Sequence, residues 1–317
     1  MHAAALSPPD VVCVASWNAD LVAHVPRLLA RGETLRATGF DIGPGGKGSN
    51  AAVACARQGA RVALIARIGD DEFGRMGQAL WAREGIATQH VACVPGERTG
   101  VAQILVYEGG DNSIAVFPGA TDGLRATHAT AAAGALAGCK VVMASCEVPL
   151  DCTLEAFRIA RAAGALTVFN PAPARALPDA LLALADVLTP NETELHALAG
   201  NAANHDAAAR ALQARGAGAI VVTLGASGCV LYRPGQAPLH IAGHAVTVAD
   251  TIGAGDTFTG ALAAALARGD ALAEAVRHAN AAGALSVRGH GAIAGMPQRA
   301  EVLALLEQEL GILKKSA

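Results

Sequence analysis

The sequence has few aromatic and few charged residues. Aromatic residues make up 3% of its 317 positions and charged residues 16%, whereas about a quarter of an average domain is charged. The apolar fraction is 52%. A disordered chain needs low hydrophobicity and a high net charge, so this composition excludes that class. With so few aromatic residues, the core must be built mainly from Ala, Val, Leu and Ile.

The chain also lacks an excess of either charge. It has 24 basic and 27 acidic residues, which give a formal net charge of −3. This balance offers no electrostatic attraction to nucleic acid or to an anionic membrane. No apolar stretch reaches the roughly 18 uncharged residues of a membrane-spanning helix. The first ten residues lack the basic and long apolar regions of a secretory signal. We therefore expect neither a nucleic-acid partner nor a membrane partner.

The seven cysteines do not form a disulfide or metal-binding pattern. Their number is odd, and no two of them are spaced as CxxC. The sequence also lacks HExxH, the HxE…PCxxC pattern of zinc deaminases, and the GxSxG of a nucleophile elbow. We expect a reduced, cytoplasmic protein whose cysteines act mostly as small core residues.

Short apolar runs alternate with amphipathic stretches of helical length. The last third, from about residue 254, is expected to form two or more helices. This alternation is typical of a mostly parallel sheet with helices on both faces. Strands are expected at 11–16, 62–66, 141–144, 166–169, 187–189 and 220–224, and helices at 49–58, 73–84, 150–163 and 206–215.

Two extended segments interrupt this alternation. Residues 99–107 and 113–117 flank a turn-forming stretch, 108–112 (EGGDN), which predicts a β-hairpin. A further extended piece, residues 33–41, lies just before a glycine cluster. Together they suggest a small β flap on the α/β body, of the kind that closes over a substrate.

The first glycine cluster, GPGGKGSN at 43–50, precedes an Ala-rich helix. It satisfies GxGxxG, but it does not follow the first strand, so a dinucleotide site is weakly supported. A P-loop is excluded because Lys47 is followed by Gly48 instead of Ser or Thr. A plain turn into the helix remains an alternative. Otherwise, free helix N–H groups, Lys47 and Asn50 would suit a polyhydroxy or phosphorylated ligand.

The second glycine cluster, DTIGAGD at 250–256, also precedes a helix, expected at 258–267. Its glycines place several N–H groups at a helix N-terminus, where they can bind an anion. Asp256 within such a turn suits phosphoryl transfer, because the carboxylate can accept a proton from an attacking hydroxyl. The alternative for Asp256 is a simple helix N-cap.

Other polar groups follow expected strands, and each has a structural alternative. In TPNETE (189–194), Asn191 and Glu194 fit either a helix capping box or a site for hydrated Mg²⁺. Asn18 and Asp20 could bind sugar hydroxyls or simply form a turn, and Glu147 is equally ambiguous. The stretch TLGASG (223–228) alone indicates only a loop.

Taken together, these motifs resemble the ribokinase-like (PfkB) carbohydrate kinase family. The two signatures of the family correspond to residues 43–50 and 250–256. Four further stretches also occur in the family's order: NAD (18–20), NPAPARALPD (170–179), TPNETE (189–194) and TLGASG (223–228). The resemblance implies an α/β/α three-layer sandwich with a mostly parallel central sheet and a small β-sheet lid. It implies one kinase domain over 1–317, with the lid built from about 18–45 and 97–118.

The resemblance also implies an ATP-dependent sugar kinase, a phosphotransferase with an alcohol acceptor. Its expected substrate is the 5-hydroxyl of D-ribose, with another sugar or a nucleoside as the alternative. Mg²⁺ and K⁺ are the expected ions, and a homodimer through the lids is the expected assembly. A non-catalytic sugar or nucleotide sensor with the same fold remains a second alternative. It would bind ligand without releasing ADP.

The resemblance assigns roles to individual residues. Asp256 matches the catalytic base, and Gly253, Ala254 and Gly255 match the anion hole. The expected sugar-binding residues are Asn18, Asp20, Gly46, Lys47, Asn50, Glu147 and Asp256 itself. The expected nucleotide-side residues are Asn191, Glu194, Thr223, Gly225, Ser227, Gly228, Gly255 and Asn280, with Glu194 linked to Mg²⁺. The expected monovalent-cation site consists of Asp250 and Ile252 with main-chain oxygens near Ser286, Gly289, Gly291 and Gly295.

Overall fold

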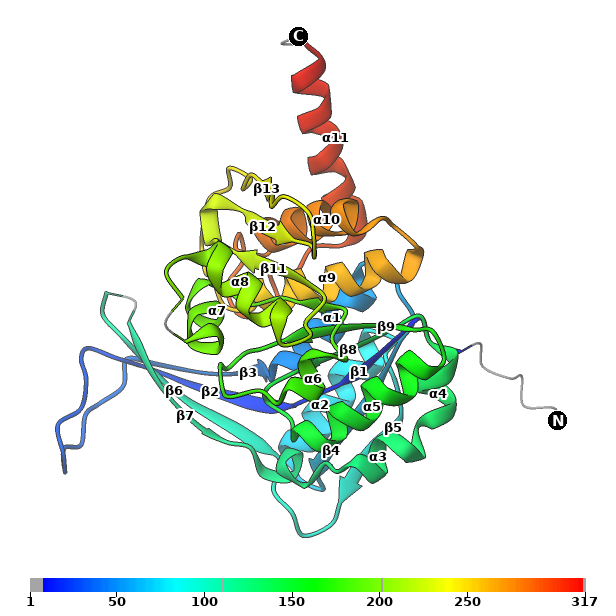
Figure 1. Cartoon of the computed structure of the whole chain (residues 1–317). Coiled ribbons are helices and arrows are strands. Elements are labelled where there is room, and N and C mark those ends of the chain that lie inside the picture. The colour runs from blue at the N-terminus through cyan, green and yellow to red at the C-terminus, as the bar shows by residue number, and fades with distance from the viewer. Residues whose placement is uncertain (1–7, 110, 201, 316–317) are drawn as a thin grey trace.

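The computed structural model describes residues 8–109, 111–200 and 202–315. Within these residues the chain forms a central sheet of nine strands and a separate sheet of four (Figure 1). The central sheet has the strand order β13-β12-β11-β10-β9-β8-β1-β4-β5. Neighbours from β5 to β11 pair in parallel, and β12 and β13 pair antiparallel at one edge. The expected α/β fold with a mostly parallel sheet is therefore confirmed.

The central strands are short and mostly buried on both faces, as parallel strands between two helical layers must be. Val11 and Cys13 of β1 face one hydrophobic cluster, while Val12 and Val14 face the other. The central strands are β1 (Val11–Val14), β4 (Val62–Gly69), β5 (Ala87–Val94), β8 (Val141–Ser145), β9 (Leu166–Asn170), β10 (Val187–Leu188), β11 (Ala219–Thr223), β12 (Cys229–Tyr232) and β13 (Leu239–Ile241).

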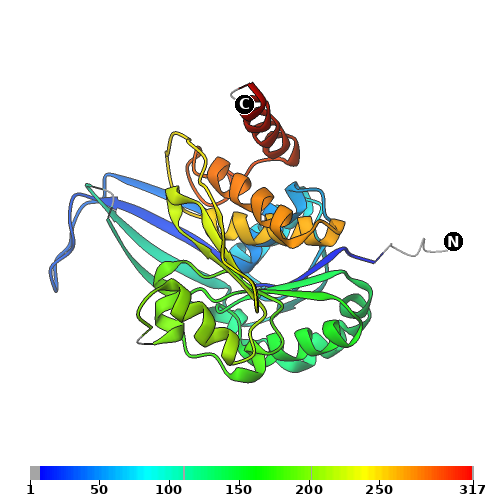
Figure 2. The same ribbon diagram turned by 45° about the horizontal axis from the view of Figure 1, so that its top comes forward.

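Two layers of helices cover the central sheet (Figure 2). The first layer contains α1 (Lys47–Arg57), α2 (Glu72–Arg83), α9 (Ala254–Arg268), α10 (Leu272–Ser286) and α11 (Arg299–Lys315). The second contains α3 (Ala126–Ala131), α4 (Ala133–Gly138), α5 (Leu150–Ala162), α6 (Asp179–Leu182), α7 (Glu192–Ala199) and α8 (His205–Ala214). Two 3₁₀ turns, η1 (Gly119–Gly123) and η2 (Gly225–Ser227), lie in connections. Six of the seven free cysteines are buried, and Cys93 is exposed.

The smaller sheet, which we call the lid sheet, has the order β3-β2-β6-β7. Its strands are β2 (Asn18–Val25), β3 (Gly39–Gly45), β6 (Gly100–Tyr107) and β7 (Asn112–Phe117). The predicted hairpin is confirmed, since β6 and β7 pair antiparallel from Val101↔Phe117 to Val106↔Asn112. Gly110, in the predicted turn, lies outside the described residues. The lid sheet extends to one side of the helical layers (Figure 2).

Several predicted boundaries were wrong. Of residues 33–41, only the part from Gly39 onward is a strand, and Asn18 and Asp20 begin β2 instead of forming a loop. The strand β2 was not predicted because Asn18 and Asp20 at its start favour a turn, and pairing with β3 and β6 makes the segment extended. The strands β5, β12 and β13 were not anticipated. Among the helices of the described residues, none is long and apolar enough to cross a membrane.

Candidate active site

The N-terminal ends of α1 and α9 lie against each other, and this contact brings the two glycine clusters together. Gly260 of α9 makes the approach possible, because an added Cβ would overlap the carbonyl oxygen of Ala51 in α1. Gly48 is equally constrained, since a Cβ there would lie 2.5 Å from the Cα of Ala15. Gly260 therefore lets α9 approach α1, and Gly48 lets the start of α1 approach the chain that follows β1.

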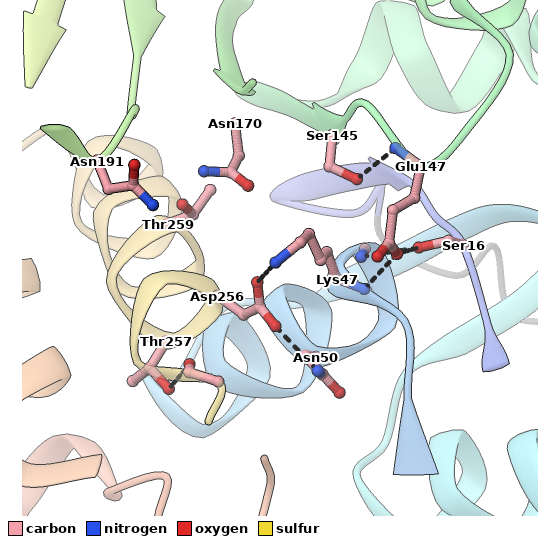
Figure 3. Close-up of polar contacts among 12 residues, drawn as sticks. Ser16, Lys47, Asn50, Ser145, Glu147, Asn170, Asn191, Asp256, Thr257 and Thr259 are labelled. Carbon is pink, nitrogen blue, oxygen red and sulfur yellow. Dashed lines mark hydrogen bonds and ion pairs between the residues drawn. The ribbon is translucent and has the colours of Figure 1, made fainter. Parts of the chain in front are cut away.

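Asp256 lies at this contact, in the first turn of α9 (Figure 3). One of its oxygens accepts a hydrogen bond of 2.9 Å from Asn50 Nδ2, and the other lies 3.9 Å from Lys47 Nζ. Burial raises the pKa of Asp256, while Lys47 and Asn50 oppose the rise. A buried carboxylate with a raised pKa is a better proton acceptor than a solvated one.

Asp256 is not the N-cap of its helix, so the structural alternative for this residue was wrong. The N-cap is Gly253, whose φ of 78° is left-handed, and α9 begins at Ala254. The helix begins before the start predicted at residue 258, because Gly255 and Asp256 belong to the helix and not to the preceding turn. The first backbone N–H groups of a helix have no partner within it, so residues 253–255 can offer donors to an anion.

Glu147 organises the side of the site at the start of α1. Its Oε2 accepts hydrogen bonds from Ser16 Oγ at 2.6 Å and from the Lys47 amide at 2.8 Å. Burial raises the pKa of Glu147. Gly46, with a φ of 88°, lies so close that an added Cβ would be 2.9 Å from the Ser16 carbonyl oxygen. Glu147 thus fixes the turn that positions Lys47.

Asn18 and Asp20 reach the same region from the first part of β2. An added Cβ at Gly45 would overlap the carboxylate of Asp20, and one at Gly100 would overlap Asn18 Oδ1. The pKa of Asp20 is raised to about 7, first by burial and then by the charges of Glu147 and Asp256. The lid sheet therefore adds a third carboxyl group whose field reaches the other two.

Among the described residues, Asn50 Oδ1 is buried and has no hydrogen-bond partner. A buried acceptor without a donor costs free energy, typically about 1–3 kcal/mol. Its amide nitrogen is already engaged by Asp256. The oxygen is therefore available to a donor such as the hydroxyl of a bound sugar.

A cavity of about 500 Å³ lies on the side of Asp256 opposite Asn50. Its walls combine the start of α9 with the ends of β10 and β11. The sequence-predicted residues that line it are Lys47, Asn191, Glu194, Thr223, Gly225, Ile252, Gly253, Ala254, Gly255 and Asp256. Its size and its amide-rich end suit a phosphorylated ligand.

Three predicted nucleotide-side residues are not among those that line this cavity. Asn280 donates a hydrogen bond of 2.8 Å to the carbonyl of Ala242. Gly228 has a φ of 92°, and an added Cβ would overlap the carbonyl of Ile241. Ser227 ends the 3₁₀ turn η2 just before it. All three shape the turns beside the cavity.

Asn191 and Glu194 form the predicted capping box of α7. Asn191 Oδ1 accepts from the Glu194 amide at 2.8 Å, and Glu194 Oε2 accepts from the Asn191 amide at 2.9 Å. Both residues also line the large cavity. The capping interpretation is confirmed, and the same geometry holds the Glu194 carboxylate at the cavity wall.

The six residues of the expected cation site lie together. Asp250 accepts hydrogen bonds from the amides of Ile252 at 2.9 Å and Gly291 at 2.8 Å. Gly295 lies so close to Ser286 that a Cβ added at Gly295 would overlap the Ser286 carbonyl oxygen. A Cβ added at Gly289 would lie 2.7 Å from the Gly295 Cα.

No group of three or more His, Cys, Asp or Glu side chains in the described part of the chain could hold a metal ion. The donors at the expected cation site are the Asp250 carboxylate and main-chain oxygens. Oxygen donors of this kind suit a hard cation better than a soft transition metal.

Four residues near Asp256 or Glu147 were not predicted as site residues. Asn170 ends β9 and donates a hydrogen bond of 2.8 Å to the Thr189 carbonyl, and Thr189 Oγ1 lies 3.0 Å from Thr259 Oγ1. Ser16, the fourth, follows β1. Three of these residues sit at or just beyond the carboxyl ends of parallel strands, where open α/β sheets bind ligands. A polar residue at the carboxyl end of a predicted strand was therefore the sequence feature that could have identified them.

Residues 8–299 match the sequence profile described as pfkB family carbohydrate kinase. The chain belongs to this family, so the predicted resemblance is confirmed.

Within the family, the chain is similar to ribokinases. It is 40% identical over 296 residues to the ribokinase of Haemophilus influenzae, covering 92% of this chain and 96% of that protein. The structure of Arabidopsis thaliana ribokinase complexed with ribose and ATP is 32% identical, with a TM-score of 0.88 over 95% of this chain and 99% of that one. A deoxyribokinase of Salmonella typhi is 34% identical over 293 residues, covering 91% and 95% of the two chains.

Proposed function

We propose that the chain is an ATP-dependent ribokinase that transfers the γ-phosphoryl group of ATP to the 5-hydroxyl of D-ribose. The observation that carries this proposal is the position of Asp256. On one side lie the sugar-type donors and acceptors of α1, β2 and Glu147, and on the other lies the amide-rich cavity. The similarity to ribokinases, one of them complexed with ribose and ATP, supports the choice of substrates.

The residues of the site can carry out each step of the transfer. Asp256 accepts the proton of the sugar hydroxyl, whose oxygen attacks the γ-phosphorus while the bond to the β-phosphate oxygen breaks and ADP leaves. The amides of residues 253–255 stabilise the negative charge on the transferring group. Lys47 adds a positive charge, and its pKa is raised chiefly by Asp256, which keeps it protonated. Its ammonium lies 3.9 Å from the carboxylate of the base, and both residues line the cavity.

Mg²⁺ is part of this proposal, with Glu194 as its link to the protein. The Glu194 carboxylate is held at the cavity wall by the capping box of α7. A carboxylate and phosphate oxygens are the ligands that Mg²⁺ prefers, usually with several waters retained. When bound, the ion would neutralise charge on the β- and γ-phosphates.

K⁺ at the site formed by Asp250, Ile252, Ser286, Gly289, Gly291 and Gly295 is also part of the proposal. The close approach of Gly295 to the Ser286 carbonyl leaves no room for side chains and brings main-chain oxygens together. The site adjoins the anion-binding turn, because Ile252 immediately precedes Gly253. We expect a bound ion to order this turn without touching the substrates.

Two other acceptors remain alternatives to ribose. The similar Salmonella typhi protein is a deoxyribokinase, so a sugar that differs only at the 2-position is one of them. A nucleoside is the other. Asn18 and Asp20 are placed to distinguish them, because a site that binds a hydroxyl through buried polar groups rejects a substrate without it.

A homodimer through the lid sheets completes the proposal. The register places the exposed side chains of Phe40, Ile42 and Phe117 on one face of the lid sheet. Ile114 and Val116 lie on the other face, which they share with Asp20. Exposed apolar side chains on both faces of a small sheet are typical of an interaction surface. A second copy of the lid sheet would cover the face that carries Phe40, Ile42 and Phe117.

A coupled assay of ADP release tests the function directly. Ribose, deoxyribose, fructose, adenosine, inosine and pseudouridine are compared with MgATP, and ³¹P and ¹³C NMR locate the phosphate on the product. We expect the highest kcat/KM with ribose and a 5-phosphate product. Ligand binding without ADP release would instead indicate a sensor, and a preference for another acceptor would reassign the substrate.

A further inference from the structure

The C-terminal end of α1 contacts the segment that contributes to the expected cation site. Arg57 Nη1 donates hydrogen bonds to the carbonyls of Ile293 at 2.8 Å and Met296 at 3.0 Å. The next residue, Gln58, donates from Nε2 to the carbonyl of Pro297 at 2.8 Å. Three main-chain oxygens of one short segment are thus held by two adjacent side chains.

The guanidinium of Arg57 is itself fixed. Its Nε and Nη2 donate to the two carboxylate oxygens of Glu84 at 3.0 and 2.8 Å. The Arg57 and Glu84 side chains are only 16% and 11% exposed, so solvent screens this pair weakly. The two-pronged pairing sets the plane of the guanidinium, which leaves Nη1 directed at the two carbonyls.

The other side of the segment faces the catalytic turn. The Gly291 amide donates to Asp250, and Gly295 presses on the Ser286 carbonyl. A Cβ added at Gly253 would lie 2.7 Å from the carbonyl oxygen of Ala292, so the anion-binding turn also rests on this segment. Arg57 and Gln58 therefore engage the carbonyls of Ile293, Met296 and Pro297, while the Gly291 amide of the same segment engages Asp250.

We propose that Arg57 is a positioning residue for the monovalent cation, which it never touches. By holding the carbonyls of Ile293 and Met296, it sets the orientation of the peptide groups between them. This inference rests on the cation site of the proposed function. Both ends of α1 would then contribute to the reaction. Lys47 and Asn50 at its start contact Asp256, and Arg57 at its end orients the segment of the cation site.

The test compares Arg57→Gln and Arg57→Lys with the unaltered protein without ATP or sugar. Thermal unfolding is followed by circular dichroism across a KCl series, with choline chloride keeping the ionic strength constant. We expect K⁺ to raise the Tm of the unaltered protein. Both variants should need about tenfold more K⁺ for half of that rise, the scale expected when hydrogen bonds from a charged group are lost. The kcat at saturating K⁺ should stay within about twofold.

Arg215→Gln is the matched control. Arg215 also combines an ion pair, with Asp179 at 2.8 Å, and a hydrogen bond to a carbonyl, that of Leu177 at 2.7 Å. None of its hydrogen bonds within the described part of the chain goes to the segment 286–297. We expect this variant to lose stability while the K⁺ concentration at half effect stays unchanged.

Two results would overturn the inference, and they can be told apart. If the unaltered protein shows no K⁺-dependent change in Tm, the proposed cation site itself is wrong. If the unaltered protein responds and the Arg57 variants respond at the same K⁺ concentration, the site stands and the role of Arg57 fails. Should Arg57→Gln not fold, Arg57→Lys gives the same comparison, because a lysine keeps the charge but cannot bind Glu84 and both carbonyls at once.

Discussion

Asn50 and Asp256 are 206 positions apart in the sequence, yet Asn50 Nδ2 donates a 2.9 Å hydrogen bond to the Asp256 carboxylate. This bond joins the helix that follows the first glycine cluster to the helix that begins with the second. It holds one carboxylate oxygen, while the other faces Lys47. The base is thereby oriented before any substrate binds, which is the condition for efficient proton transfer.

Replacing Asp256 by Asn removes the proton acceptor and keeps the shape of the side chain. We expect kcat to fall by roughly 10²–10⁴-fold, the usual scale for a lost general base. Because Asp256 is buried and its pKa is raised by that burial, the neutral variant should be at least as stable as the unaltered protein. Steady-state ADP release and thermal unfolding measure the two effects. Near-full activity in this variant contradicts the proposed mechanism.

Replacing Asp20 by Asn should change stability in a pH-dependent way. The pKa of Asp20 is about 7 in the folded protein against 3.8 for the ordinary group. Between these values the folded state binds more protons than the unfolded state, so this group makes stability fall as pH rises. We expect Asp20→Asn to raise the Tm above about pH 7, and the difference to vanish below about pH 4.

The same variant should lose affinity for the sugar. An ionised carboxylate accepts hydroxyl hydrogen bonds more strongly than an amide does. The KM for ribose should rise at pH 8, and the pH dependence of kcat/KM near neutrality should flatten. Asp41→Asn serves as the control, because this carboxylate is 75% exposed on β3 and pairs with His24. If kcat/KM had the same pH profile in Asp20→Asn and in the unaltered protein, Asp20 would not be a sugar-binding residue.

Much of this architecture could be predicted from local patterns. Six of the nine central strands, β1, β4, β8, β9, β10 and β11, and the helices α1, α2, α5 and α8 were found within a few residues, because their apolar pattern is strong. The strand β2 was missed because NAD at its start reads as a turn, and only pairing with β3 and β6 makes it extended. Ser16 was missed as a site residue for a similar reason. Its role depends on Glu147, which lies 131 positions away in the sequence.

The residue Gly260 should be intolerant of any side chain. A Cβ at this position would overlap the Ala51 carbonyl and lie 2.8 Å from the Ala54 Cβ, so Gly260→Val must push α1 and α9 apart. Overpacking of this kind typically costs about 1–3 kcal/mol. We expect a lower Tm and, because Asn50 moves away from Asp256, a reduced kcat.

Gly283→Ala provides the control for this prediction. Gly283 is also in a buried helix packed on α9, but an added Cβ there meets its nearest neighbour, the Ala254 carbonyl, at 3.5 Å. That is ordinary contact, and Ala favours the helix by up to about 1 kcal/mol over Gly. The variant should be as stable as the unaltered protein or slightly more so. If Gly260→Val were equally harmless, the close contact of α1 and α9 would not be what aligns the site.

A charge on the lid sheet should prevent the proposed dimer. Phe117 is 56% exposed on the edge strand β7, on the same face as Phe40 and Ile42. Burying a carboxylate among apolar side chains is costly, so Phe117→Glu should weaken association at least tenfold in analytical ultracentrifugation. Leu166→Glu is the control, because Leu166 is 40% exposed at the start of β9, outside the lid sheet. A monomeric unaltered protein at micromolar concentration, or a Phe117→Glu variant that dimerises normally, would place any assembly elsewhere.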